Sequence, residues 1–238
     1  KVQKKRAKNI IQKSITNLEI QEKKQKIINL VYDNLTHNRE SSLFDISSYE
    51  ADEMQMLEDD KIVDYLYHRF RYIVYPRKKL IENYPPLLQI EPSSVCNFRC
   101  VFCYQIDKTF NKKKNGFMGT MTLDLFEQVI DQIEGEIAFI TMASRGEPLL
   151  AKDFPKMLDY IHGKFLTVKI NTNASMINEK MIHNILSSSV NTVVFSADAA
   201  EENLYSQLRV NGSLNKILKN IELFSEIKSK QYSDTKLI

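Results

Sequence analysis

Glycine and proline are scarce in this 238-residue chain, with six of each, which excludes a collagen-like or linker-dominated architecture. Long apolar runs are also missing. The longest mainly apolar run, at residues 137–143, is far shorter than the roughly 20 residues that a membrane-spanning helix needs. No apolar stretch near residue 1 could serve as a secretory signal. The net charge of +3 is too small to indicate a nucleic-acid partner by itself. We therefore expect a cytoplasmic globular protein.

Cysteine is scarcer still, with three residues, and its placement is informative. The three cysteines lie close together, at Cys96, Cys100 and Cys103. A disulfide framework uses an even number of cysteines spread along a secreted chain, so it does not fit this sequence. Random placement of three cysteines would give this C-x3-C-x2-C spacing roughly once in ten thousand sequences. The cluster therefore requires a chemical reason.

Three thiolates on one tight loop can converge on a single metal centre. All four histidines lie in helical patterns, where a surface or core role is more common than metal ligation: His37, His68, His162 and His183. A structural zinc site normally has four protein ligands, so three cysteines without an evident fourth ligand favour an open site. Thiolates suit iron–sulfur clusters, and three of them leave one iron free to bind a substrate or cofactor. An iron–sulfur cluster is therefore favoured, with zinc as the alternative.

The first 86 residues form a helical region that is basic and then acidic. Residues 1–30 carry nine lysines and arginines against two glutamates, and their apolar spacing predicts one or two amphipathic helices. A solvated helix face is the favoured interpretation, with a partner surface as the alternative. The acidic residues 45–64 suggest a connection followed by a helix start. A helical pattern then runs from Ile62 to Pro76, where the proline is expected to end the helix.

Beyond residue 86, short apolar runs alternate with helical patterns. Strands are predicted at residues 87–91, 137–142, 166–170 and 192–195, and residues 236–238 would open a fifth. Helices are predicted at residues 122–133, 154–161, 179–186, 204–208 and 214–224. Four strand-then-helix units indicate an α/β fold with a parallel sheet and right-handed crossovers. Because chemistry in such folds lies at the carboxyl ends of the strands, we expect the functional residues to follow them.

Polar residues do follow each of these strands. The cysteine loop follows the first strand, and residues 144–148 follow the second. In that second turn, the carboxylate of Glu147 could accept hydrogen bonds from an ammonium group, and Gly146 would let a ligand approach the backbone. The other polar groups at strand ends are Asn171, Thr172, Asn173, Ser196 and Asp198. Arg209, expected on the next helix one turn after Tyr205, is a natural partner for a carboxylate. Each residue alone is more often structural, and their joint placement indicates a site.

These features resemble the radical S-adenosylmethionine superfamily, and most of all its SPASM-type subgroup. The cysteine loop matches the C-x3-C-x-aromatic-C signature, with Phe102 as the aromatic residue. The turn Gly146-Glu147-Pro148 resembles the family's methionine-amine-binding turn, although Arg145 stands where many relatives have glycine. Two further segments carry the resemblance: Asn171-Thr172-Asn173-Ala174, with Ala174 replacing a glycine, and Phe195-Ser196-Ala197-Asp198 followed by Tyr205, Arg209, Gly212 and Ile217.

The resemblance implies a partial (β/α) barrel over residues 87–238, preceded by the helical residues 1–86. The family barrel usually has six βα units, and this chain shows about four. We therefore expect a fragment of a longer protein that is incomplete at its C-terminus. The SPASM-type subgroup also carries auxiliary clusters in a C-terminal region, and the cysteines for them are absent from this sequence.

Site residues follow from the resemblance. Cys96, Cys100 and Cys103 would hold three irons of a [4Fe–4S] cluster, whose fourth iron is chelated by S-adenosylmethionine. The other residues implied to bind the cofactor are Gly146 and Glu147 at the methionine amine, Ser196 and Arg209 at the ribose and carboxylate, Tyr104 through its backbone near the adenine, and Asn173. No catalytic side chain is assigned.

The implied activity is reductive cleavage of S-adenosylmethionine followed by hydrogen abstraction from a substrate. The subgroup's targets make a peptide or protein, or a sugar-type small molecule, the expected substrate. A low-potential donor of the flavodoxin or ferredoxin type would supply the electron, and neither a membrane nor nucleic acid is expected as a partner. The alternative is a non-catalytic scaffold held together by zinc or a cluster, with the basic helices as its interaction surface.

Overall fold

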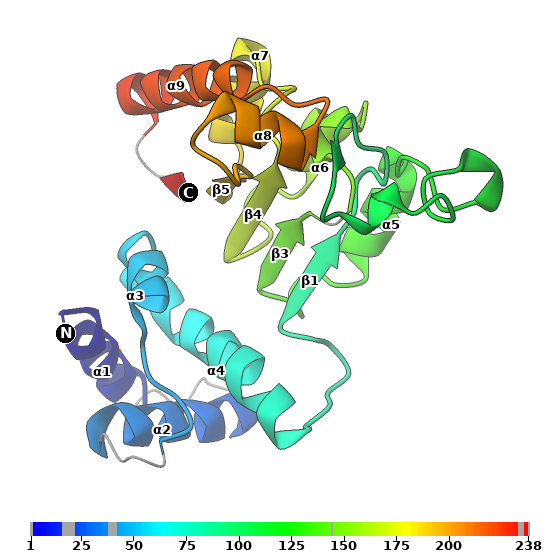
Figure 1. The fold of residues 1–238 in the computed structure, drawn as a ribbon. Coiled ribbons are helices and arrows are strands. Elements are labelled where there is room, and N and C mark those ends of the chain that lie inside the picture. The colour runs from blue at the N-terminus through cyan, green and yellow to red at the C-terminus, as the bar shows by residue number, and fades with distance from the viewer. Residues whose placement is uncertain (1, 16–21, 38–41, 144, 233–235, 238) are drawn as a thin grey trace. The chain divides into compact units, whose positions relative to one another are not determined.

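The computed structural model describes residues 2–15, 22–37, 42–143, 145–232 and 236–237, drawn in Figure 1. The chain divides into two compact units. One contains Lys1–Leu87 with the short segment Glu136–Ala138, and the other contains Leu88–Gly135 and Phe139–Ile238. None of the described helices combines the length and apolarity that crossing a membrane requires.

The first unit is helical. Its α-helices are α1 (Val2–Ile15), α2 (Glu22–His37), α3 (Ser48–Gln55) and α4 (Ile62–Lys78), with a short 3-10 turn, η1 (Asp59–Lys61), before α4. Ile11 of α1, Ile28 of α2 and Leu66 of α4 are fully buried, because apolar residues at helical spacing form one face on each helix. Helix α1 contacts α2 and α4, and α2 contacts α4, so these faces share one core.

Helix α3 was not predicted, because the acidic stretch was interpreted as a connection. Its signal in the sequence is the Ser-x-x-Glu spacing of a capping box, in which the Ser47 backbone N–H donates to the Glu50 carboxylate at 3.1 Å. The same carboxylate pairs with Arg69 of α4 at 2.7 Å. The Arg69 guanidinium lies 5.1 Å from the ring centres of both Tyr49 and Tyr72. This buried pair attaches α3 to α4.

The prediction that Pro76 ends α4 was wrong, because the helix continues to Lys78. A proline so close to the end removes only one backbone donor from the last turn, which the helix tolerates. The helix ends where Lys79 adopts a left-handed conformation, with φ of 53°. The Lys79 and Leu80 N–H groups then donate to the Pro76 and Tyr75 carbonyls at 3.2 and 3.0 Å.

The second unit is an α/β sheet, as predicted. Its strands are β1 (Leu87–Ile90), β3 (Phe139–Met142), β4 (Thr167–Thr172), β5 (Val190–Phe195) and β7 (Lys236–Leu237), in spatial order β1-β3-β4-β5-β7. Strands β3, β4, β5 and β7 pair in parallel. Residue 238, which the sequence assigned to the last strand, lies outside the described residues.

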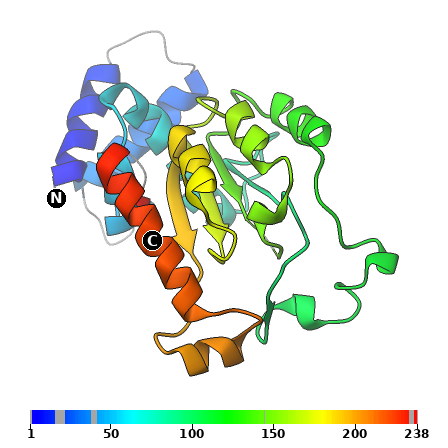
Figure 2. The same cartoon turned by 90° about the horizontal axis from the view of Figure 1, so that it is seen from above.

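Helices connect these strands: α5 (Leu123–Asp131), α6 (Phe154–Tyr160), α7 (Glu179–Ser187), α8 (Glu202–Leu208) and α9 (Leu214–Gln231). Three more 3-10 turns lie in the loops: η2 (Tyr104–Ile106), η3 (Lys113–Asn115) and η4 (Pro148–Leu150). Helices α5, α6, α7 and α9 each contact the next, and Figure 2 shows them in a row along one side of the strands. Phe126, Phe154 and Phe224 are fully buried under this layer. Because the strands run parallel, the loops that follow them lie at one edge of the sheet.

A small antiparallel pair was not predicted. Strand β2 (Arg99–Cys100) pairs with β6 (Arg209–Val210), and Cys100 lies opposite Arg209. Arg209 is therefore in a strand, and its expected position on a helix was wrong. Helix α8 ends at Leu208, because the following backbone turns to pair with the cysteine loop and then takes a left-handed conformation at Asn211, with φ of 71°.

Burial in the helical unit makes its stability depend on pH. Burial, together with the adjacent positive charge of Arg71, lowers the pKa of His68 from 6.5 to about 4. The folded protein thus keeps His68 neutral at a pH where the unfolded chain binds a proton. Stability should therefore be complete above pH 6.5 and fall as the pH drops from there toward 4. We expect a loss of about 1–2 kcal/mol between pH 7.5 and pH 5, measured by urea unfolding and far-UV circular dichroism.

The control is His37, which is exposed on α2. His68→Gln should flatten the pH dependence in this window, whereas His37→Gln should leave it as in the wild type. An unchanged pH dependence in His68→Gln would contradict the assignment.

Candidate functional site

A cavity of about 200 Å³ lies where the chain leaves successive strands. Its walls come from the loop after β1, the turn after β3, the ends of β4 and β5, and β6: Cys96, Phe98, Cys100, Phe102, Cys103, Gln105, Ala143, Arg145, Gly146, Glu147, Asn171, Asn173, Ser196 and Arg209. Eight of the nine predicted site residues are therefore brought together here. The ninth, Tyr104, is exposed on η2 and is not among the lining residues, and its ring lies 5.6 Å from that of Phe110.

All three cysteines carry free thiols. N–H groups approach two of the sulfurs: the Phe98 backbone lies 3.4 Å and Asn173 Nδ2 lies 3.8 Å from Cys96 Sγ, and Arg209 Nη1 lies 3.7 Å from Cys100 Sγ. Such donors stabilise an anionic sulfur. Burial nevertheless raises the pKa of Cys96 and of Cys100. A bound metal would favour the thiolate form of both residues, because metal binding is coupled to thiol ionisation.

The described residues include no group of three His, Cys, Asp or Glu side chains that could hold a single metal ion. A tetrahedral zinc ion with bonds of about 2.3 Å holds its sulfurs about 3.8 Å apart. In an iron–sulfur cluster each thiolate binds a different iron, so the sulfurs lie farther apart. The three thiols line one cavity, and a set of three thiolates suits an iron–sulfur cluster.

Glu147 is a buried connector between two turns. Its Oε1 accepts hydrogen bonds from Leu149 N at 3.2 Å and Thr172 Oγ1 at 2.7 Å, and its Oε2 accepts from Asn173 N at 2.7 Å. Only 2% of the residue is exposed, and burial raises the pKa of its carboxyl group. The carboxylate thus fastens the turn after β3 to the end of β4, and both of its oxygens have partners within the chain.

Gly146 lies against the backbone of the cysteine loop. A Cβ atom at this position would be 1.7 Å from the Ser93 carbonyl oxygen and 2.8 Å from the Ser94 Cα. The next residue continues the contact, because Glu147 N donates to the Val95 carbonyl at 2.9 Å. Only glycine allows these two loops to approach so closely.

Asn173 links the turn after β4 to the cysteine loop. Its Nδ2 donates to Asn97 Oδ1 at 3.0 Å, and its Oδ1 accepts from Ser175 N at 2.9 Å. Asn97 Nδ2 donates to Ser175 Oγ at 2.8 Å. Ala174 follows with a left-handed φ of 61°, a conformation that favours glycine. This strain explains why the corresponding family motif has glycine where this chain has alanine.

Arg209 carries the cationic side of the cavity. It forms an ion pair with Asp198, and its guanidinium lies 5.5 Å from the ring centre of Phe102. Only 8% of Arg209 is exposed. Ser196 lies at the end of β5, where its backbone N–H donates to the Thr172 carbonyl at 2.8 Å. Arg209 thus places its guanidinium beside Cys100, and Ser196 adds a hydroxyl group at the end of β5.

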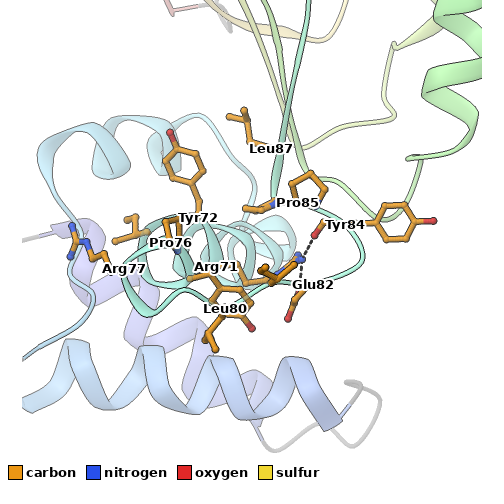
Figure 3. A pocket seen from close by; sticks show the side chains of 13 residues that line it. Arg71, Tyr72, Pro76, Arg77, Leu80, Glu82, Tyr84, Pro85 and Leu87 are labelled. Carbon is orange, nitrogen blue, oxygen red and sulfur yellow. Dashed lines mark hydrogen bonds and ion pairs between the residues drawn. The ribbon is translucent and has the colours of Figure 1, made fainter.

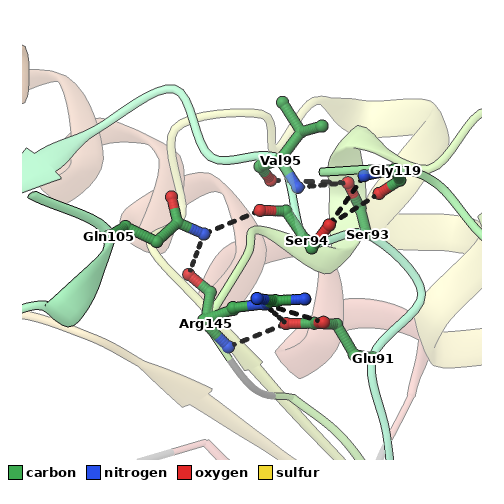
Figure 4. Close-up of polar contacts among 7 residues, drawn as sticks. All are labelled: Glu91, Ser93, Ser94, Val95, Gln105, Gly119 and Arg145. Atoms are coloured by element: carbon green, nitrogen blue, oxygen red, sulfur yellow. Dashed lines mark hydrogen bonds and ion pairs between the residues drawn. The ribbon is translucent and has the colours of Figure 1, made fainter. Parts of the chain in front are cut away.

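A polar network that the sequence did not indicate supports the turn after β3 (Figure 4). Gln105 Nε2 donates to the Ser94 carbonyl at 2.7 Å and to the Arg145 carbonyl at 2.8 Å. The Arg145 side chain pairs with Glu91 at 3.1 Å. Arg145 can therefore replace the glycine that many relatives have at this position, because its side chain pairs with the carboxylate of Glu91. Residue 144 lies outside the described residues. The only signal for Gln105 in the sequence is its position two residues after Cys103.

A second cavity, of about 700 Å³, lies within the helical unit (Figure 3). Apolar and aromatic side chains from the end of α4 and from residues 80–87 form most of its wall. At its base Arg71 pairs with Glu82 at 2.5 Å and donates to the Tyr84 carbonyl at 2.8 Å. It contains none of the predicted site residues and no thiol.

Comparisons with known proteins agree with this geometry. The model of the Radical SAM superfamily matches residues 90–236. The GTP 3',8-cyclase of Clostridium botulinum strain Hall is 26% identical over 141 residues, which cover 57% of this chain and 42% of the cyclase. Mycofactocin maturase MftC of Mycobacterium ulcerans is 27% identical over 150 residues, covering 60% of this chain and 39% of the maturase.

A solved structure shares the fold. Streptococcus suis SuiB superimposes with a TM-score of 0.52 at 20% identity, covering 90% of this chain and 49% of SuiB. SuiB has also been solved bound to S-adenosylmethionine and bound to its precursor peptide SuiA. This chain thus spans about half the length, or less, of these relatives.

The close approach at Gly146 gives a prediction. Gly146→Ala should destabilise the second unit by about 2 kcal/mol or more, because the added methyl group meets backbone atoms that have no alternative position. The matched control is Gly119→Ala, since a Cβ there has nothing within 4 Å and the residue has no left-handed φ. Its stability should stay within about 0.5 kcal/mol of the wild type in urea unfolding. Equal stability of the two variants would show that the loops do not touch at Gly146.

Proposed function

The chain belongs to the Radical SAM superfamily, whose model matches more than half of its length, and we propose that it forms the cluster- and cofactor-binding part of an enzyme that cleaves S-adenosylmethionine reductively. The observation that carries the proposal is the single cavity lined by three free cysteines and by polar residues that follow four successive strands. The family implies an iron–sulfur cluster and S-adenosylmethionine. We assign the cluster as [4Fe–4S].

The donor set suits such a cluster. Cys96, Cys100 and Cys103 would each hold one iron, and the other possible ligand among the described lining residues, Glu147, already accepts hydrogen bonds from the chain at both carboxylate oxygens. The guanidinium of Arg209 and the amide of Asn173 lie close to two of the sulfurs, and hydrogen bonds to sulfur help to set the reduction potential. One iron would then remain open to an exogenous ligand.

The remaining polar residues fit the cofactor. When bound, S-adenosylmethionine supplies a 5′-deoxyadenosyl radical that removes a hydrogen atom from the substrate. Gly146 allows the backbone at the methionine end to approach closely, and Glu147 holds this turn in place. Ser196 and Arg209 would contact the ribose and the carboxylate. Tyr104 would act through its backbone near the adenine, since its exposed ring lies beside that of Phe110. Two buried oxygens, on Gln105 and Asn171, have no hydrogen-bond partner among the described residues and could accept from donors of a ligand.

Similar proteins bear on the class of substrate. A peptide or protein substrate is supported by two similar proteins, the mycofactocin maturase and SuiB, which has been solved with its precursor peptide. A sugar-type or nucleotide-type small molecule is supported by the GTP 3',8-cyclase. A low-potential protein of the flavodoxin or ferredoxin type would supply the electron.

Iron and sulfide reconstitution tests the proposal. After anaerobic reconstitution, the protein that carries this chain should contain at least about four irons and four sulfides per chain and should release 5′-deoxyadenosine when dithionite and S-adenosylmethionine are added. Cys96→Ala, Cys100→Ala and Cys103→Ala should each lose the nucleoside product, because each removes one iron ligand. The control His162→Ala, outside the cavity, should retain it.

The competing hypothesis is a zinc-stabilised scaffold. Stoichiometric zinc that excludes iron, together with no nucleoside product, would replace the enzyme proposal with the scaffold.

A further inference from the structure

The loop over residues 101–119, which begins between the last two cysteines, exposes several large apolar side chains. Five of them have between 44% and 58% of their area exposed: Val101, Phe102, Tyr104, Ile106 and Phe117. The ring centre of Phe110 lies 5.6 Å from that of Tyr104 and 5.5 Å from that of Phe117, so these three residues form one aromatic cluster. Exposed apolar groups that gather in one place, with polar residues around them, mark interaction surfaces.

The 101–119 loop is also positively charged. It has four lysines and a single acidic residue, Asp107, which gives a net charge of +3. All four lysines are exposed: Lys108, Lys112, Lys113 and Lys114. None of them has an ion-pair partner among the described residues, whereas Lys156 and Lys164 of the same unit pair with carboxylates. The charge of the loop is therefore available to a partner.

Ser94, two residues before the first cysteine, fastens both ends of this loop. Near its start, Gln105 Nε2 donates to the Ser94 carbonyl at 2.7 Å. At its end, Ser94 N donates to the Gly119 carbonyl at 2.9 Å, and Gly119 N donates to Ser94 Oγ at 2.8 Å (Figure 4). A surface loop of this length with its ends held together is an Ω-loop, a form that frequently carries function.

Hydrogen bonds within the loop support its backbone. Asn111 Nδ2 donates to the Gln105 carbonyl at 3.1 Å, and Asn115 Nδ2 donates to the Thr109 carbonyl at 2.9 Å. The lysines at 112–114 lie between these two asparagines. Figures 1 and 2 show the loop, in green, projecting from the sheet and its helices. A surface that is already held in shape loses less conformational freedom when a partner binds.

The loop is continuous with the residues that would hold the cluster. Cys103 N donates to the Cys100 carbonyl at 3.0 Å and closes the turn between these two cysteines. Phe102, the most exposed of the five apolar residues, lies inside this turn. A protein that gives an electron to the cluster must come close to it, because the rate of electron transfer falls steeply with distance. A partner seated on the 101–119 loop would meet this requirement.

We propose that the 101–119 loop is the docking surface for an acidic one-electron donor protein of low potential. This inference rests on the proposed function. The lysines would attract acidic side chains of the donor and steer its approach, and the aromatic cluster would supply the apolar contact. One electron leaves the donor's reduced flavin or iron–sulfur centre and takes the [4Fe–4S] cluster from its 2+ to its 1+ state, with no proton or covalent bond exchanged.

A single-stranded nucleic acid is the rival partner for a loop rich in lysine and aromatic residues. Two observations favour the protein donor. The ring plane of Phe110 is inclined by 85° to that of Tyr104 and by 51° to that of Phe117, so these rings pack on one another and do not form a row of parallel faces for bases. The loop also adjoins the cysteines, where the electron must arrive.

Charge reversal in the loop tests the proposal on the cluster-loaded protein that carries this chain. Lys112→Glu/Lys113→Glu/Lys114→Glu should weaken binding of an oxidised acidic flavodoxin or an oxidised acidic ferredoxin by about tenfold or more at low salt, because attraction becomes repulsion. Isothermal titration calorimetry measures this binding, and the difference from the wild type should shrink as salt is added. A loss confined to one of the two donors would identify which of them the loop serves.

Turnover provides the second measurement. Formation of 5′-deoxyadenosine driven by a subsaturating amount of reduced donor should fall by about tenfold in the same variant. Dithionite needs no docking surface, so the dithionite-driven rate should stay within about twofold of the wild type.

The matched control reverses three other exposed lysines of the same unit, Lys180 on α7 and Lys216 and Lys219 on α9. Lys180→Glu/Lys216→Glu/Lys219→Glu changes the net charge by the same amount and should bind both donors as the wild type does. Phe117→Ala tests the apolar part of the surface and should weaken donor binding by about fivefold with an unchanged salt dependence.

Three outcomes would overturn the assignment and leave the proposed function standing. The first is unchanged donor binding in the loop variant, or an equal loss in the control variant. The second is loss of binding to a single-stranded oligouridine with donor binding retained, which would assign the loop to nucleic acid. The third is a loss of dithionite-driven product as large as the loss with the donor, which would place the loop at the cofactor or substrate. If the wild type assembles no cluster, or forms no 5′-deoxyadenosine with dithionite, the proposed function fails and this inference fails with it.

Discussion

The hydrogen bonds around the Glu147 carboxylate hold the site together. They join the turn after β3 to the end of β4, and the adjoining Gly146 brings that turn against the cysteine loop. Asn173 continues the connection to Asn97 inside the loop. The three cysteines come from one short segment, but the cavity beside them exists only because loops from separate strands are held at close range. A buried carboxylate with every oxygen satisfied is suited to this structural task, since leaving it unpaired would be costly.

Much of the second unit could be predicted from the sequence, because local patterns determine it. Each βα unit has an apolar run of strand length and a helix with one apolar face, and Thr122 caps α5 by accepting from Leu125 N, as expected at a helix start. The cysteine spacing was informative for the same reason, since all three ligands lie on one loop. Residues at strand ends were then gathered by topology, because parallel strands end at the same edge of the sheet.

The features that sequence reasoning missed depend on contacts between distant residues. Arg209 was expected on a helix, and its pairing with Cys100 in β2 and β6 has no local signal. Gln105 resembles any polar loop residue until its two carbonyl partners, Ser94 and Arg145, are known. The hydrogen bonds that Glu147 accepts from Leu149, Thr172 and Asn173 likewise have no signal in the sequence. In the helical unit, the prediction overestimated how strongly Pro76 disrupts α4. A proline near the end of a helix disrupts it less than one in the middle.

The central claim is that the three thiols hold an iron–sulfur cluster with one iron left open to S-adenosylmethionine. Mössbauer spectroscopy of protein reconstituted with ⁵⁷Fe tests this most directly, because it resolves the irons of one cluster by their ligands. The account predicts that S-adenosylmethionine changes the signal of one iron in four and leaves the other three unchanged. Four irons that do not respond to saturating ligand, or a site that takes up a single zinc ion instead, would contradict it.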